Sequence, residues 1–168
     1  MKIKTLNDVL LHELGDLYSA ETQLVKALPH LAEATTSVEL KAAFTEHLEQ
    51  TNIHVKRLQE IFSNLGQVPA KVTCEGMKGL IRECVETVRT TEDNSAARDA
   101  AIIGAAQRIE HYEIAGYGTA ETHAAVLGHN RIRELLQETL DEEKKADRNL
   151  NDLAKSSINN QAKEEVRV

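Results

Sequence analysis

The chain has 168 residues, enough for one domain with a sizeable core, and its hydrophobic share of 41% argues against global disorder. Its formal net charge of −7 makes it a poor general ligand for nucleic acid, whose phosphates require a basic face. Residues 1–5 lead directly into an amphipathic segment, and no apolar run is long enough for a signal peptide or a membrane span. We therefore expect a cytoplasmic protein that binds neither nucleic acid nor membrane.

The composition favours long helices. Aromatic residues make up only 3% and Trp is absent, so the core must consist of Leu, Ile, Val and Ala, which suit close helix packing. Only two prolines and eight glycines interrupt the chain, which argues against many short strands.

The first two predicted helices have clear start and stop signals. The first begins near Thr5, where Thr5 and Asp8 resemble a capping box, and leucines then recur at three- and four-residue steps. Pro29 lies inside this pattern, and we expect it to kink the helix or end it early because it lacks an N–H group. Ser37 is the predicted N-cap of the second helix, and Gly66 ends that helix.

Three further helices are predicted in the rest of the chain, at about 74–89, 96–127 and 131–155. The segment 74–89 is too short to be a full bundle member and is expected to belong to a crossover. Two long helices, a crossover with a short extra helix and two more long helices describe an all-α, ferritin-like four-helix bundle. We expect the bundle to cover residues 1–156 and a polar, frayed tail to cover residues 157–168.

The two cysteines do not suggest redox or zinc chemistry. Cys74 and Cys84 are ten residues apart, which on one helix is roughly 15 Å and too far for a disulfide. Neither belongs to a CxxC pair. We expect two small buried hydrophobic residues.

Each long helix interrupts its apolar inner face with acidic or histidine residues near its middle. The first helix offers Glu21, the second His47, Gln50 and His54, the next long helix Glu110 and Glu113, and the last Glu143 and Asp147. Buried carboxylates need a strong counter-charge, and inward carboxylates and imidazoles suit iron or manganese. The pattern predicts one or two such ions, with these ligand candidates: Glu21, His54, Glu110, Glu113, Glu143 and Asp147.

The same residues also allow a purely structural interpretation. Single acids on helix faces are usually solvated or paired with arginine, and Arg108, Arg131 and Arg133 are near in sequence. In the charged run 142–145 we expect only Glu143 to point inward. Tyr18 and Tyr117 could bond to groups around a metal, although such tyrosines more often bury a ring and satisfy one hydroxyl.

Several stretches resemble the YciF/YciE family (DUF892) of bacterial stress-associated proteins. They are residues 17–24, 47–51, 105–114 and 139–144, and the likeness extends over nearly the whole chain to about residue 153. The resemblance implies a ferritin-like bundle, commonly a homodimer, that is associated with stress and has no settled biochemical role.

The sequence departs from the usual ferritin-like ligand pattern, which has Glu-x-x-His on two helices. Residues 49–52 read Glu-Gln-Thr-Asn and residues 143–146 read Glu-Lys-Lys-Ala, so neither completes the motif. The family often has an acid where this chain has Gln50. His54 is then the main candidate from the second helix, and a variant site with weakened metal affinity is expected.

These observations support two functional hypotheses. The first is a ferritin-like stress protein with a di-iron or di-manganese centre which, if catalytic, oxidises ferrous iron or reduces oxygen or peroxide; no catalytic residue is assigned. The alternative is a non-enzymatic, dimeric helical scaffold or interaction protein without a functional metal site. A ferritin-style storage shell is disfavoured by the dimers of the related family.

Overall fold

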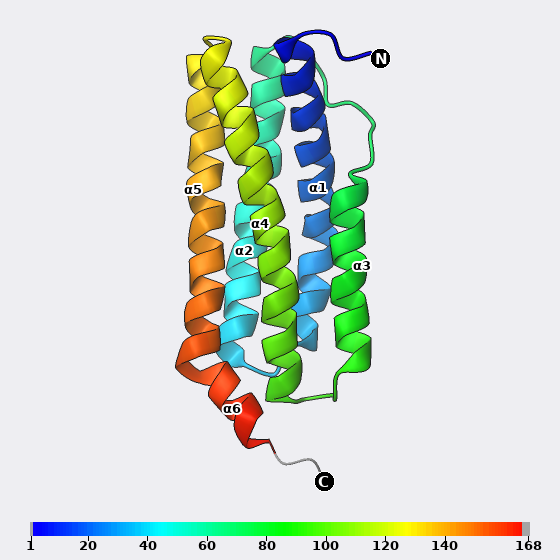
Figure 1. The fold of residues 1–168 in the computed structure, drawn as a ribbon, viewed down its shortest axis with the longest axis vertical. Helices are drawn as coiled ribbons and strands as arrows, with labels where there is room; N and C mark the ends of the chain where they lie inside the picture. The colour runs from blue at the N-terminus through cyan, green and yellow to red at the C-terminus, as the bar shows by residue number, and fades with distance from the viewer. Residues whose placement is uncertain (1, 166–168) are drawn as a thin grey trace.

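The computed structural model describes residues 2–165, and these residues contain helices and loops but no strand (Figure 1). The predicted all-α, ferritin-like bundle is confirmed. Four long helices form the bundle, and a short helix, α3, lies in the connection between the second and the third of them. Their bounds are α1 Leu6–Ala34, α2 Val38–Asn64, α3 Glu75–Thr90, α4 Ala96–Val126 and α5 Asn130–Leu153.

The crossover determines the direction of the second helix pair. Helix α3 runs back along the outside of the bundle, in contact with α1 and α4, so that α4 begins at the end of the bundle where α2 also begins (Figure 1). Helix α1 packs against α2 and α4, while α5 packs against α4 and α2. Every pair of neighbouring long helices is therefore antiparallel, and all four long helices can direct side chains to one central axis.

The predicted caps are present at the ends of these helices. Thr5 Oγ1 accepts a hydrogen bond from the Asp8 amide at 3.1 Å, and the Asp8 carboxylate accepts one from the Thr5 amide at 3.0 Å. Ser37 Oγ accepts from the amide of Leu40 at 3.2 Å. Gly66 follows α2 with a φ of +62°, a left-handed conformation that favours glycine.

Pro29 does not end α1 early, and that alternative of the prediction is wrong. The helix continues beyond it to Ala34. Leu28 and Leu31, on either side of the proline, are buried in the core. Their packing offsets the loss of one main-chain hydrogen bond at the proline.

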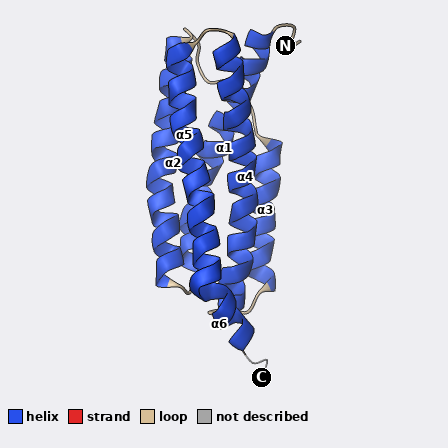
Figure 2. Ribbon diagram, turned by 60° about the vertical axis from the view of Figure 1, so that its left-hand side comes forward, coloured by secondary structure: helices blue, strands red, loops and turns tan. Residues whose placement is uncertain are grey.

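The end of the chain is helical where we expected a frayed tail. After α5 the chain forms a π-helical turn, Ala154–Ile158, and then α6, Asn159–Glu164, at the end of the bundle (Figure 2). Ile158 is buried in the core. The Glu165 carboxylate accepts hydrogen bonds from the amides of Ala96 and Ala97 at 2.6 and 3.0 Å, a favourable place for an anion at the start of α4. Residues 166–168 of the expected tail lie outside the described residues.

The two cysteines are free and buried, as predicted. Cys74 is more than a hydrophobic residue, because it is the N-cap of α3 and its Sγ accepts from the Met77 amide at 3.3 Å. The same sulfur lies 3.0 Å from Asp16 Oδ2 and 2.9 Å from the Tyr112 hydroxyl. These contacts attach the crossover to α1 and α4.

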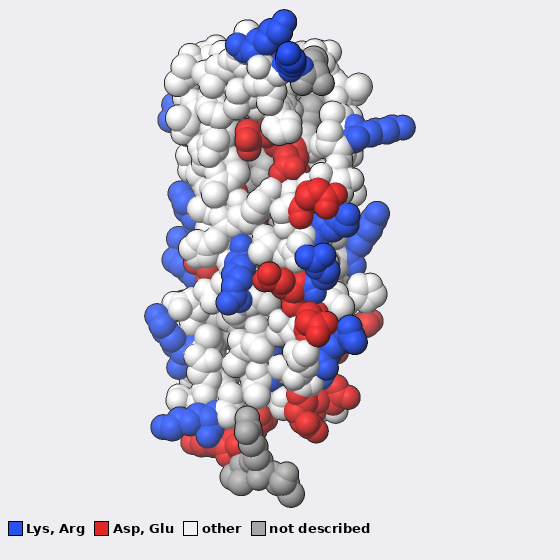
Figure 3. All heavy atoms as spheres, turned by 45° about the vertical axis from the view of Figure 1, so that its right-hand side comes forward, with Lys and Arg blue, Asp and Glu red and all other residues white. Residues whose placement is uncertain are grey.

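The surface charges are mixed where they can be seen. On the face drawn in Figure 3, acidic and basic side chains are interspersed. Helix α3 carries two such pairs, Lys78 with Glu75 and Arg89 with Glu86. Within residues 2–165, none of the helices has a stretch that is both long and apolar enough to cross a bilayer.

The apolar core is divided into two clusters along the bundle. Leu17 of α1 belongs to one cluster and Leu24 to the other, and Glu21 lies between them in sequence. On α5, Leu140 belongs to the cluster of Leu17 and Leu150 to the cluster of Leu24. A buried polar layer therefore separates two apolar halves, and all four long helices contribute to it.

Candidate metal centre

Six acidic and histidine side chains form the centre of the polar layer, and each is at most 6% exposed. They are Glu21 of α1, His47 and His54 of α2, Glu110 and Glu113 of α4, and Glu143 of α5. Helical spacing explains why they converge. The two histidines are seven residues apart, almost two full turns, and the two acids of α4 are three apart, so each pair lies on one helix face.

The six residues form two groups of donor atoms that share Glu143. In each group, one donor atom from every member lies within 4.8 Å of the others. A first-row metal ion binds such donors at about 2.0–2.2 Å, so this spacing allows one ion to contact a whole group. One group is His47, Glu110, Glu113 and Glu143, and the other is Glu21, His54 and Glu143. We call them the His47 half and the His54 half.

The imidazole nitrogens face the carboxylates directly. His47 Nε2 lies 3.3 Å from Glu110 Oε1 and 3.8 Å from Glu143 Oε2. His54 Nδ1 lies 2.9 Å from Glu143 Oε1 and 3.3 Å from Glu21 Oε1. The contacts around His54 Nδ1 do not have hydrogen-bond geometry, although they are short.

Most donor atoms of the layer have no hydrogen-bond partner. Among the described residues, the buried side-chain nitrogen and oxygen atoms without a partner belong, apart from His123 Nδ1, to the six residues of the two halves. Both oxygens of Glu113 and both of Glu143 are among them. Buried polar atoms are rarely left unpaired, so this concentration of donor atoms makes the layer a candidate site for a cation.

The electrostatics show the cost of burying these charges. Burial, together with the neighbouring acids, raises the pKa of Glu110 and of Glu143 to about 8 and raises that of Glu113 well above its usual value. Burial alone would lower the pKa of His54, but the carboxylates of Glu142, Glu143 and Glu21 outweigh it and raise the pKa to about 12. Without a metal ion, bound protons offset the negative charge of the layer.

A second set of contacts orients His54. Its Nε2 lies 2.9 Å from Glu142 Oε2, and Arg57 Nη1 donates to the same oxygen at 2.7 Å and to Thr139 Oγ1 at 2.6 Å. The bond with His54, opposed by partial burial and aided by Arg57, lowers the pKa of Glu142 to about 2, so this acid is an anion. A carboxylate on Nε2 leaves Nδ1 free for a metal, the arrangement common around metal-bound histidines.

The tyrosine of α4 also contacts the layer. Tyr117 is buried, and its hydroxyl donates a hydrogen bond to Glu21 Oε1. Burial and the nearby acids raise the pKa of Tyr117 well above its usual value, so the hydroxyl keeps its proton. Tyr18, by contrast, lies at the edge of the bundle, where its hydroxyl accepts from Gln59 at 3.1 Å.

Of the predicted ligand candidates, the structure brings together Glu21, His54, Glu110, Glu113 and Glu143. Asp147 lies outside both halves, because it accepts a hydrogen bond from Gln107 at 3.0 Å and lies 3.5 Å from His111 Nε2. His47 belongs to the cluster but was not among the candidates, although its seven-residue spacing from His54 was a signal.

Two expectations about charged residues need correction. Glu142 was assigned to the solvated face, yet it reaches His54 because Arg57 binds its carboxylate. The three arginines that could have paired with the inner acids bind other groups. Arg131 pairs with Glu60, Arg133 pairs with Glu121, and Arg108 donates to the Gly104 carbonyl.

The fold and this layer place the chain in a recognisable class, the ferritin-like four-helix bundles with a buried carboxylate–histidine cluster. The chain belongs to the DUF892 family, described as a domain of unknown function, whose profile matches residues 5–163. It is 46% identical over 163 residues to Protein YciF of Escherichia coli (strain K12), covering 96% of this chain and 98% of that protein.

Solved structures agree with this assignment. The crystal structure of the E. coli stress protein YciF matches with a TM-score of 0.89 and 43% identity, over 97% of this chain and 100% of that chain. YcfI from Rhodopseudomonas palustris matches with a TM-score of 0.86 and 45% identity, over 89% of this chain and 95% of that chain. A ferritin-like, diiron-carboxylate protein from Bacillus anthracis str. Ames has a TM-score of 0.69 at 18% identity, over 90% of this chain and 99% of that chain. At this identity the match supports the fold and nothing more.

Proposed function

We propose that this protein binds two iron or manganese ions in the centre of its bundle and acts in a bacterial stress response. The observation that carries the metal proposal is the buried layer of four carboxylates and two imidazoles, most of whose donor atoms have no hydrogen-bond partner among the described residues. The stress role is suggested by the E. coli relative, which is described as a stress protein.

Charge balance supports this proposal over a scaffold without metal. The side chains of Glu21, Glu110, Glu113 and Glu143 are almost fully buried, and the only basic side chains that reach them as ion-pair partners within the described residues are His47 and His54. A divalent ion in each half offsets the four negative charges without protonating any carboxylate. Carboxylate and imidazole donors without thiolate suit iron or manganese.

We further propose that the bound centre undergoes redox chemistry with oxygen or peroxide. Iron or manganese supplies an electron at such a centre. The protein would hold the ions in place, exclude bulk water with the two apolar clusters, and keep a protonated hydroxyl, that of Tyr117, against Glu21.

Metal analysis tests the central proposal. We expect about two ions per chain after anaerobic loading with ferrous iron, one for each half. In the double variant Glu21→Ala/Glu110→Ala, which removes one ligand from each half, we expect this stoichiometry and the thermal stabilisation by ferrous ion to be lost. A wild-type stoichiometry near zero after loading would contradict the proposal and favour the scaffold.

A matched control separates loss of ligands from loss of negative charge. Asp147 is an acid on α5, one turn from Glu143, but lies outside both halves. The variant Asp147→Asn should keep the full stoichiometry. If it loses metal as the double variant does, the assignment of ligands is wrong.

We also propose a homodimer, as the resemblance to the YciF/YciE family implies. Light scattering should then give twice the chain mass of 18.6 kDa. A monomer at micromolar concentration would contradict this part of the proposal without affecting the metal centre.

A further inference from the structure

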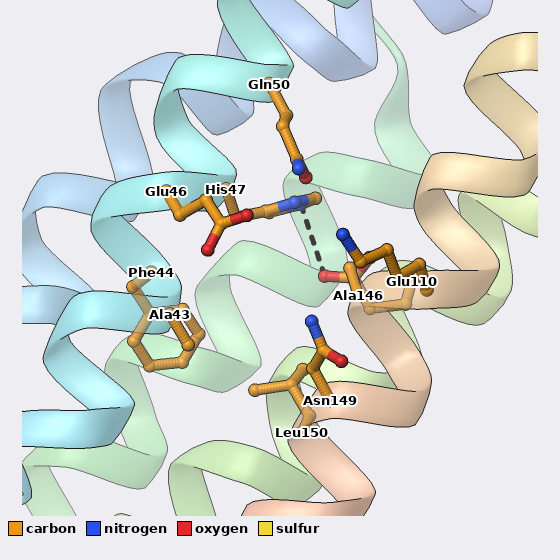
Figure 4. A pocket seen from close by; sticks show the side chains of 10 residues that line it. Ala43, Phe44, Glu46, His47, Gln50, Glu110, Ala146, Asn149 and Leu150 are labelled. Carbon is orange, nitrogen blue, oxygen red and sulfur yellow. Dashed lines mark ion pairs between the residues drawn. The ribbon is translucent and has the colours of Figure 1, made fainter.

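A small cavity between α2 and α5 reaches the His47 half of the centre (Figure 4). Its volume is about 30 Å³, and the buried side chains of His47 and Glu110, joined by the dashed ion pair in Figure 4, lie at its inner end. The other half is deeper, because Glu21 and His54 are fully buried while His47 remains slightly exposed. The two halves of the centre therefore differ in access from the surface.

The walls of this cavity are apolar. Ala43 and Phe44 of α2 lie opposite Ala146 and Leu150 of α5 (Figure 4). Such walls offer no hydrogen bond to a charged guest that has lost its water, so they disfavour ions.

The outer end of the cavity carries no net charge. It is lined by Glu46 and Lys145, which are exposed and opposite in sign, and by the neutral amides of Gln50 and Asn149. An ion of either sign therefore gains no electrostatic attraction from the entrance.

At the inner end, neither ring nitrogen of His47 has a hydrogen-bond partner among the described residues. His47 Nε2 lies against the carboxylates of Glu110 and Glu143, whereas no such contact is found for the buried Nδ1 within residues 2–165. A metal-bound imidazole normally donates its second N–H. Since His47 lines the cavity, a guest molecule with an oxygen atom could accept the hydrogen bond from this N–H, for which the protein provides no acceptor.

We propose that this cavity admits a neutral, oxygen-containing molecule of about two heavy atoms to the His47 half, a description shared by hydrogen peroxide and dioxygen. One water needs about 10–15 Å³ of cavity volume, so the space present holds a guest of about this size and excludes larger organic peroxides. The inference rests on the proposed metal function, since the guest is placed beside the ions.

Two neighbouring alanines provide a test variant and its control. Ala43 lines the cavity, whereas Ala42 on the same helix is exposed and does not line it. The change Ala43→Leu fills the space, and Ala42→Leu makes the same chemical change on the surface. If Ala43→Leu fails to fold, Ala146→Val narrows the cavity from the opposite wall.

Nitric oxide, a neutral diatomic molecule, is the probe of access. Protein loaded anaerobically with ferrous iron is mixed with nitric oxide, and its association is followed by absorption and by electron paramagnetic resonance. We expect Ala43→Leu to slow association by about tenfold or more, since overpacking opposes entry, while Ala42→Leu matches wild type. Equal rates in the two variants, at equal iron content, would overturn the inference and leave the metal function intact.

Dioxygen and hydrogen peroxide are then distinguished by mixing each with the iron-loaded variants and following the loss of ferrous iron. The molecule that uses this cavity is slowed in Ala43→Leu, and if neither is slowed the inference is overturned. Tert-butyl hydroperoxide, which is too large, should react slowly with every variant; fast reaction with wild type would also overturn it.

A measurement without metal keeps the two proposals separate. Xenon binds small apolar cavities, so crystals of the metal-free protein under xenon pressure should show xenon between Ala43 and Ala146. The site should be absent in Ala43→Leu. Iron-free wild type after loading would refute the proposed function alone, whereas xenon absent from this cavity would refute the inference.

Discussion

Glu143 is the residue whose replacement has the most specific consequence, because it belongs to both groups of donor atoms. The change Glu143→Gln keeps the size of the side chain and removes its charge. We expect it to abolish binding at both halves. The change His47→Gln, by contrast, removes a donor from one half only and should leave binding at the His54 half.

The size of the effect follows from linkage. An ion present at 100 times its dissociation constant stabilises the folded state by about 2.7 kcal/mol, so two ions contribute about 5 kcal/mol. For a chain of this size, 1 kcal/mol corresponds to about 2–4 °C in Tm, which gives roughly 10–20 °C for wild type. His47→Gln should keep about half of this shift and Glu143→Gln none of it.

Differential scanning calorimetry with and without ferrous iron or manganese, under anaerobic conditions, measures these shifts. The metal-free melts must be compared first, because a buried amide in place of Glu143 costs about 1–3 kcal/mol if it lacks a partner. The variant Asp147→Asn should shift like wild type. If Glu143→Gln kept more than half of the wild-type shift, the shared-ligand geometry would be refuted.

Two further predictions concern the polar layer, and a third concerns the end of the chain. The pKa of Glu110 and that of Glu143 are raised to about 8, so the folded metal-free protein binds more protons than the unfolded chain above about pH 4.5. Its free energy of unfolding should therefore fall between pH 5 and 8, by up to about 1.4 kcal/mol per pH unit for each group, and its Tm should fall with it, while stabilisation by metal grows. A Tm that rises over this range contradicts the assignment. Glu142→Gln removes the anion that orients His54 and should weaken metal binding by about 10- to 100-fold in calorimetric titration, whereas an unchanged affinity would show that the contact is incidental. Ile158→Ala should destabilise the protein by about 2–5 kcal/mol in urea titrations, and a change below 0.5 kcal/mol, roughly that of a surface site, would show that the turn leading into α6 does not pack on the core.

The helices could be predicted because their ends are determined locally. Thr5 and Ser37 cap the amides that follow them, and Gly66 adopts the left-handed conformation that stops α2. The capping hydrogen bonds join residues three positions apart, so a short stretch of sequence is enough to recognise them. The helical tail depends instead on contacts with α4, almost seventy positions away, so the polar composition after residue 156 was misleading.

The candidate site was predicted in outline for a related reason. Glu21 interrupts a leucine face, and Glu110 and Glu113 are three residues apart, so helical geometry alone points them inward. Asp147 is four residues after Glu143, which rotates it by about 40° around α5. This places it at the boundary with α4, where it meets Gln107.

Contacts between helices decided what the sequence pattern could not. Glu142 is about 100° around α5 from Glu143, on a face that reads as solvated. It is drawn to His54 because Arg57 of α2 supplies a cation beside it. That pairing joins residues 85 positions apart, so no local sequence pattern predicts it.

Without metal, the polar layer is an unfavourable arrangement for a protein core. Replacing the layer with leucines would join the two apolar clusters into one core and, in the metal-free state, would remove a cluster of buried acids. Burial raises the pKa of Glu110 and that of Glu143 to about 8, so in the metal-free protein bound protons reduce the buried negative charge at neutral pH. Because a metal ion and these protons compete for the same oxygens, binding must release protons near neutral pH. Proton release measured during metal titration in weakly buffered solution therefore tests the central claim without any variant: at pH 7 we expect at least one proton per ion, and none would mean that the ions bind elsewhere.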